Sequence, residues 1–322
     1  MNLGLVELPL EVSPATSGAR CNHRHAATIA SMTEIAAPDP APALSPALAH
    51  VLRCLELEAL DHDLFLGDPG PGTGRLFGGM VAAQSVMAAG HTVEPERRLH
   101  SLHAYFLRPG RHDRPLRFLV DRIRDGRSFT TRRVKAHQSG EAIFALEASY
   151  ALPEDGIEHQ EPIPEVPPPE ECIDRESARL RKLGEEWQNH PVNAVEVRVT
   201  DDRNLAGGER TEPRQLYWMR LRGTIAEPGE RLLTALFVYA SDRALLSTAA
   251  LPHGVHWGKG MAASLDHALW IHRPTDLHDW HLFATESPAA FAGRGIVFGG
   301  IFRRDGSRVA SVAQEALIRP QR

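Results

Sequence analysis

The chain contains an internal repeat, and this repeat limits its architecture more than any other feature of the sequence. The segment 264–274 echoes the segment 100–109, and both end in an Arg-Pro pair. Nearly the same offset aligns two later turns, Ser139-Gly140 and Asp305-Gly306, and the apolar runs that follow them. Because repetition of this kind means that one supersecondary unit is used more than once, we expect an α+β unit that occurs twice in the chain.

Composition and charge exclude several classes of function. The 322 residues are 42% hydrophobic and 24% charged, which is typical of a soluble globular protein with room for two domains that each bury a core. The formal net charge of -5 argues against a general nucleic-acid binder. No apolar run approaches the ~18–20 residues of a membrane-spanning helix. We therefore expect no nucleic-acid partner and no membrane insertion.

The cysteines and the first apolar stretch favour a reducing compartment. Cys21, Cys54 and Cys172 are widely spaced and cannot form a fully paired disulfide framework. Glu7 and Glu11 interrupt the apolar stretch at the start of the chain, so a secretory signal is not expected. The predicted location is the cytoplasm.

The N-terminal segment differs in composition from the rest of the chain. Residues 1–50 are rich in Ala, Pro, Ser and Thr and lack amphipathic periodicity, which predicts a disordered extension. The run 21–25 contains one Cys and two His, but no second ligand pair follows at zinc spacing. No metal site is expected.

Residues 51–152 are predicted to form the first unit. The small residues of the run 78–90 favour a helix that packs closely on a sheet. Strand-like runs follow it, and Asp-Gly and Ser-Gly pairs favour hairpins between neighbours. A helix enclosed by long antiparallel strands is the hot-dog arrangement. The run 55–66 is expected to be an entry strand with short turns, and the later strands are 100–107, 116–124, 128–137 and 142–152.

Residues 153–190 are predicted to connect this unit to a second one. Six prolines in 153–171 mark an extended linker, and 170–190 are expected to be helical. Residues 191–322 then repeat the first unit with a longer helix over 230–249. The expected fold is α+β, a tandem (double) hot-dog in which two antiparallel sheets are each wrapped around a central helix. The expected strands of the second unit are 195–200, 215–225, 262–272, 280–287, 293–303 and 308–318.

The run Phe77-Gly78-Gly79 at the start of the first helix has two interpretations. Paired glycines leave backbone N–H groups uncovered at a helix end with partial positive charge, so Gly78 and Gly79 could bind a substrate carbonyl or a developing oxyanion. Close packing of the helix explains the same glycines equally well.

Three polar residues of the second unit suggest a hydrolytic site. Asp242 lies on the long helix beside an apolar run, Ser264 opens the next strand, and Gln314 lies on the last strand. The repeat alignment places Ala148 opposite Gln314, which suggests one working site and one degenerate copy. Singly, each residue could also be an ordinary surface residue.

Together, an Asp, a Ser hydroxyl and a Gln amide can hold one water molecule. The Asp accepts its proton and the amide fixes its direction, which gives general-base hydrolysis without a metal, a cofactor or a covalent intermediate. A serine-hydrolase triad is poorly supported because no Gly-x-Ser-x-Gly motif occurs.

An ordered set of segments resembles the type II acyl-CoA thioesterases, which are double hot-dog enzymes, over roughly residues 52–319. The resemblance implies an acyl-CoA substrate, hydrolysed to a fatty acid and CoA in lipid metabolism, and no cofactor. The catalytic Asp, Thr or Ser, and Gln of that family fall on Asp242, Ser264 and Gln314. Homo-oligomers are implied, with Arg294 as a candidate phosphate contact. The matching segments are 75–84, 100–110, 124–129, 132–134, 240–242, 252–254, 264–274 and 309–315.

Two other functions stay open at this point. An enoyl-CoA hydratase on the same fold would need an Asp and a His in an Asp-x-Asn-Pro-x-His type motif, which is absent from the sequence. A non-catalytic acyl-CoA binding protein would keep the fold and lose the water-holding residues, whereas this chain keeps all three.

Overall fold

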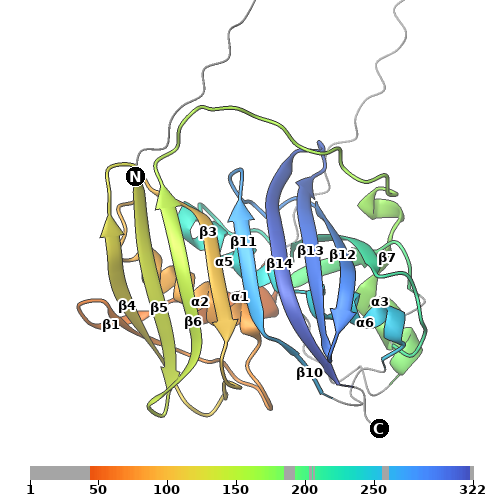
Figure 1. Cartoon of the computed structure of the whole chain (residues 1–322), viewed down its shortest axis with the longest axis horizontal. Helices are drawn as coiled ribbons and strands as arrows, with labels where there is room; N and C mark the ends of the chain where they lie inside the picture. The colour runs from red at the N-terminus through yellow and green to blue at the C-terminus, as the bar shows by residue number, and fades with distance from the viewer. Residues whose placement is uncertain (1–43, 185–192, 203–204, 206, 256–260, 320–322) are drawn as a thin grey trace, which may run out of the picture. The chain divides into compact units, whose positions relative to one another are not determined.

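A continuous antiparallel sheet is the main feature of the fold, seen here in a computed structural model (Figure 1). The structure describes residues 44–184, 193–202, 205, 207–255 and 261–319. Within these residues the sheet has 14 strands in the order β1-β2-β4-β5-β6-β3-β11-β14-β13-β12-β9-β8-β7, and β10 pairs with β14. The two sheets expected from the sequence are therefore parts of one continuous sheet.

Residues 58–151 build the first half of this sheet and its helix. The elements are β1 (Glu58–Asp61), β2 (Leu64–Gly67), α2 (Gly78–Gly90), β3 (Arg98–Phe106), β4 (Leu116–Asp125), β5 (Phe129–Gln138) and β6 (Glu141–Ala151). Buried residues alternate along β5 and β6 because successive side chains of a strand point to opposite faces. Ser139 and Gly140 join these two strands with φ values of 53° and 86°, both positive, as a type I′ hairpin turn requires.

Residues 195–319 build the second half with a similar order of elements. They are β8 (Val195–Val199), β9 (Arg214–Leu221), α5 (Glu230–Ser241), α6 (Leu245–Ala250), β10 (Met261–Ser264), β11 (Asp266–Ile271), β12 (His281–Phe291), β13 (Arg294–Arg303) and β14 (Arg308–Arg319). The short strand β7 (Ile173–Asp174) of the connecting segment pairs with β8.

The two halves meet where β3 and β11 pair antiparallel. His103 is opposite Ala268 in this pairing, and the same two residues are equivalent when the Arg-Pro pairs of the repeat are superposed. The pairing between the halves is therefore centred on equivalent residues of the sequence repeat. The central helices α2 and α5 lie on one face of the sheet and pack against each other (Figure 1).

The described chain becomes helical before the predicted boundary at residue 51. α1 (Pro46–Leu55) overlaps the end of the segment predicted to be disordered. Ser45 caps it by accepting a hydrogen bond from the Leu48 N–H, and its buried apolar residues hold it on the core. Residues 1–43, including the Cys- and His-containing run 21–25, lie outside the described residues.

Two elements that were expected to be continuous are interrupted. The predicted helix 230–249 is divided into α5 and α6, because Ala244 adopts a left-handed φ of 65° through which an α-helix cannot continue. The predicted strand 262–272 is divided into β10 and β11, and the register of pairing with β14 changes between them. The first interruption places Asp242 at the end of α5, and the second places Ser264 at the end of β10.

The connecting segment between the halves follows the second half of the sheet. It passes over the strand ends in Figure 1 and packs on the outer face, where the Trp218 indole donates a 2.9 Å hydrogen bond to the Pro167 carbonyl. The connecting segment contains a 3₁₀ turn, Pro169–Glu171. Another 3₁₀ turn, Leu251–His253, lies in the second half, directly after α6.

The helix expected over 170–190 is shorter in the structure. α3 (Arg175–Leu183) begins after Asp174, whose carboxylate accepts the Ser177 N–H, and it ends at Gly184 with a φ of 60°. Residues 185–192 lie outside the described part of the chain. The predicted strand 55–66 is likewise the end of α1 followed by β1 and β2.

Candidate active site

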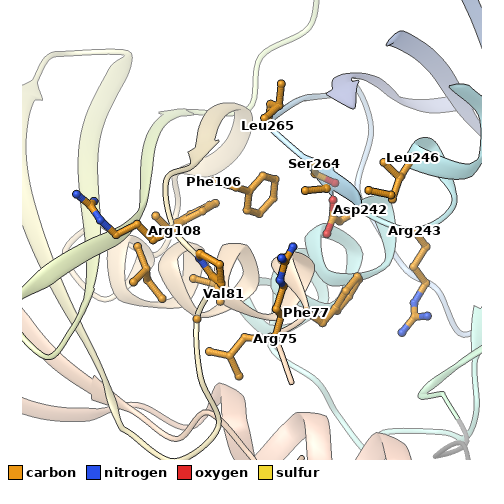
Figure 2. A pocket seen from close by; sticks show the side chains of 18 of the residues that line it. Arg75, Phe77, Val81, Phe106, Arg108, Asp242, Arg243, Leu246, Ser264 and Leu265 are labelled. Atoms are coloured by element: carbon orange, nitrogen blue, oxygen red, sulfur yellow. The ribbon is translucent and has the colours of Figure 1, made fainter. Parts of the chain in front are cut away.

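A cavity of about 690 Å³ is lined by residues of both halves (Figure 2). The second half contributes the end of α5, the start of α6 and β10, and α3 contributes two arginines. The volume is within the range of small-molecule sites. The first half contributes an apolar wall around the start of α2 and the end of β3, formed by Leu76, Phe77, Val81, Phe106, Ile143 and Phe144.

The buried carboxylate of Asp242 lies where the two central helices meet. Asp242 is the residue that ends α5, and its Oδ1 accepts a 2.7 Å hydrogen bond from Nε2 of Gln314. The carboxylate also accepts the backbone N–H of Gly79 at the start of α2. Phe77, which precedes α2, provides no side-chain cap. Asp242 therefore caps the N-terminus of α2 from the other half of the chain.

Burial raises the pKa of Asp242 to about 6. The hydrogen bonds from Gln314 and Gly79 and the charge of Arg243 act in the opposite direction, because each stabilises the ionised form. A carboxylate with this pKa is mostly ionised at neutral pH, yet it accepts a proton more readily than an exposed aspartate does. These are the properties required of a general base.

Close contact between helices accounts for the paired glycines. A Cβ on Gly79 would lie 2.6 Å from the backbone oxygen of Tyr239, and one on Gly78 would lie 2.9 Å from Oδ2 of Asp242. Gly79 is buried, does not line the cavity, and donates its N–H to Asp242. Gly78 does line the cavity. An oxyanion-binding role can therefore belong to Gly78, whereas the N–H of Gly79 is already engaged.

The structure brings the three predicted catalytic residues to one place. Asp242 and Ser264 both line the cavity, and Figure 2 shows their side chains in the same part of it. Gln314 is 1% exposed and lies behind Asp242, to which it is hydrogen-bonded. Its Oε1 is buried and has no hydrogen-bond partner in the described part of the chain.

The corresponding place in the first half has different residues. His91 follows α2 at the position that Asp242 has after α5, and Ala148 is the buried counterpart of Gln314. The first half therefore provides neither a carboxylate nor an amide where the second half provides both.

Arg294 does not join the site. It lies on β13, its Nε is 2.9 Å from Oε1 of Glu315, and it does not line the cavity.

Asp242 is the single carboxylate among the described residues that line the cavity. Five arginines that line the cavity were not among the predicted site residues, because long-range folding brings them together: Arg75, Arg108, Arg175, Arg179 and Arg243.

The chain matches known proteins of one enzyme family. Residues 188–317 match the family described as Acyl-CoA thioesterase, and residues 67–151 match the family described as Acyl-CoA thioesterase N-terminal domain. The chain is 38% identical over 283 residues to acyl-coenzyme A thioesterase 8 of Mus musculus, covering 84% of this chain and 88% of that protein. It is 37% identical over 286 residues to acyl-CoA thioesterase 2 of Haemophilus influenzae, covering 86% and 99%.

Solved structures give the same result for the fold. The acyl-CoA thioesterase II TesB2 from Mycobacterium marinum superposes with a TM-score of 0.70 at 36% identity, covering 84% of this chain and 98% of that chain. A protein with the hot-dog fold from Alicyclobacillus acidocaldarius superposes with a TM-score of 0.66 at 18% identity, covering 84% and 98%. The second likeness concerns the fold alone.

Proposed function

Because the chain belongs to the acyl-CoA thioesterase family, we propose that it hydrolyses acyl-CoA thioesters with a water molecule activated by the set Asp242, Ser264 and Gln314, in which Gln314 acts through Asp242. We also propose that its two halves are hot-dog units in tandem that share one catalytic centre. The observation that supports the residue assignment best is the buried carboxylate of Asp242, which is hydrogen-bonded to Gln314 and lies in a cavity lined by both halves.

In the proposed reaction the water oxygen attacks the carbonyl carbon of the thioester while one water proton passes to Asp242. The tetrahedral intermediate then collapses with cleavage of the C–S bond. Asp242 returns the proton to the departing CoA thiolate, so the products are a fatty acid and CoA. The N–H of Gly78 is proposed to stabilise the oxyanion, since it opens α2 at the cavity wall.

Each of the other two residues has a proposed task. The Gln314 amide holds Oδ1 of Asp242, and Oδ2 lies beside Gly78 at the cavity wall, where it can accept the proton of the water. The Ser264 hydroxyl, which lines the same cavity, is proposed to position the water. The apolar wall of the first half is proposed to hold the acyl chain.

Release of free thiol from a panel of acyl-CoAs tests this function. We expect thiol release by the natural chain and a large loss in the Asp242→Asn variant. Binding of acyl-CoA without thiol release would instead identify a non-catalytic binding protein. Hydration of an enoyl-CoA without thiol release would identify a hydratase.

We propose further that the chains associate into a closed symmetric homo-oligomer. Within the described residues, β1 and β7 end the sheet, and a terminal strand leaves backbone groups available for pairing. Light scattering at micromolar protein tests this, and a fully active monomer would contradict it. No helix in the described part of the chain is long and apolar enough to cross a membrane. The cytoplasmic location stays a prediction.

A further inference from the structure

One wall of the cavity carries a cluster of arginines on the side of α3 and the α5–α6 break. Arg175, Arg179 and Arg243 all line the cavity there. Arg175 is the first residue of α3 and is 8% exposed. Its Nε is buried without a partner in the described part of the chain, and its ion-pair partner there is Glu176, at 3.6 Å.

The position of Arg175 is electrostatically unfavourable. Burial and the neighbouring guanidinium groups of Arg179 and Arg243 lower the pKa of Arg175 to about 10. The positive end of the α3 dipole adds to this repulsion, because Arg175 stands in the first turn of the helix. A buried charge with weak compensation destabilises a fold, so protein stability alone does not explain this arginine.

Arg243 is oriented by aromatic groups rather than by a carboxylate. Its guanidinium lies 4.9 Å from the ring centre of Phe77 and 5.1 Å from that of Tyr239, and it donates a 2.8 Å hydrogen bond to the Tyr239 hydroxyl. Its Nε is also buried without a partner among the described residues. These contacts hold the side chain of Arg243, which lines the cavity, and leave part of its hydrogen-bonding capacity unused.

We propose that Arg175 and Arg243 form an anion-binding subsite for an oxyanion of the thioester substrate, either a phosphate of CoA or a carboxylate at the far end of the acyl group. This inference rests on the proposed function. A guanidinium group presents a planar fork of N–H donors that matches a phosphate or carboxylate, and the N-terminus of α3 attracts the same charge. The bound anion would offset the repulsion among the arginines.

The test measures binding of non-hydrolysable thioethers by calorimetry, so it does not depend on turnover. The ligands are S-hexyl-CoA, an S-alkyl-CoA of equal length that ends in a carboxylate, and S-hexyl-pantetheine, which has no phosphate. The variant is Arg175→Met. The matched control is Arg181→Met, because Arg181 is an exposed arginine on the same helix that does not line the cavity.

Loss of one charge-assisted hydrogen-bonding group is expected to raise Kd about tenfold or more. If the anion is a CoA phosphate, Arg175→Met weakens both CoA ligands and leaves S-hexyl-pantetheine unchanged. If it is the acyl carboxylate, the variant weakens the carboxylate-terminated ligand alone. Equal Kd changes for all three ligands, or changes no larger than those of Arg181→Met, would overturn the proposal.

Two controls separate this inference from folding and from the proposed function. Removing one of three like charges should leave the melting temperature of the ligand-free protein unchanged or higher. Should Arg175→Met fail to fold, Arg175→Lys keeps the charge without the fork and should show the same pattern of ligand preference with a smaller loss. Failure of the natural chain to release thiol from any acyl-CoA would contradict the proposed function, whereas the thioether affinities would still be measurable.

Discussion

The side-chain amide of Gln314 donates a 2.7 Å hydrogen bond to Oδ1 of Asp242, although the two residues are 72 positions apart in the chain. The strand β14 and the end of α5 therefore meet at one buried carboxylate. Because the N–H of Gly79 reaches the same group from the first half, the ionisation of Asp242 depends on three separate elements.

Asp242→Asn is expected to lower kcat by about two orders of magnitude or more, which is the scale of lost general-base catalysis. Asn is nearly isosteric, so the fold should be retained, as circular dichroism can verify. Asp155→Asn, at an exposed carboxylate of the connecting segment, is the control and should have normal kcat. Full activity in a folded Asp242→Asn protein would exclude the assigned role.

The pH dependence of kcat/KM should follow the ionisation of Asp242. Burial places its pKa at about 6, and only the ionised form accepts a proton. We expect kcat/KM to be constant above this pH and to fall about tenfold for each pH unit well below it. An acid limb near the ordinary aspartate value of 3.8 would show that another group limits the rate.

The same pKa predicts a pH-dependent stability difference. The folded-state pKa of about 6 exceeds the ordinary value of 3.8, so folding favours the protonated form. This contribution to stability is complete below pH about 4 and is lost as the pH rises through about 6. The Asp242→Asn variant does not lose this contribution. The difference between its melting temperature and that of the natural chain should therefore become more favourable to the variant as the pH rises from about 4 to above about 6. A difference that does not change with pH would contradict the buried ionisable state.

Gln314→Ala should shift the acid limb of kcat/KM to higher pH and lower kcat. The Gln314 hydrogen bond lowers the pKa of Asp242, so its removal makes the carboxylate easier to protonate. Binding of a thioether substrate analogue should be nearly unchanged, because Gln314 does not line the cavity. If affinity falls and the acid limb stays in place, Gln314 contacts substrate instead of orienting Asp242.

Gly79→Ala should destabilise the protein by about 1–3 kcal/mol. The added Cβ would lie 2.6 Å from the backbone oxygen of Tyr239, which cannot move without shifting α5. Urea unfolding measures the effect. Gly156→Ala, where a Cβ would meet nothing within 4 Å, is the control and should change stability by less than about 0.5 kcal/mol. Equal effects of the two substitutions would show that the helices are not closely packed.

Much of the fold is predictable because local signals agree with tertiary structure. The helix expected over 78–90 has the same limits as α2, and the predicted Ser139-Gly140 turn is present, with Gly140 at a positive φ that glycine adopts readily. The break after α5 has no such signal. Ala244 is neither Gly nor Asn, and its left-handed conformation is supported by distant contacts, such as the hydrogen bond from the Tyr217 hydroxyl to the Arg243 carbonyl.

The candidate site is predictable only in part. Asp242 and Gln314 are recognisable from their sequence context, and the structure places them in contact. Arg175 lies at the end of a segment rich in Pro and Glu, where an arginine carries no information about a cavity. Arg175 is the first residue of α3, which directly follows β7, and β7 pairs with β8 at the edge of the second half of the sheet. This pairing fixes the start of α3. Such a position depends on the complete topology and not on neighbouring residues.

The contact between Asp242 and the start of α2 has a consequence for fragments of the chain. The carboxylate and the glycine N–H that it binds belong to different halves, and the connecting segment that contains α3 joins these halves. If the chain were divided within that segment, each of the two resulting polypeptides would contain only part of the candidate active site. Thiol release after mixing them would then report fragment complementation, since hydrolysis would require β3 of one fragment to pair with β11 of the other.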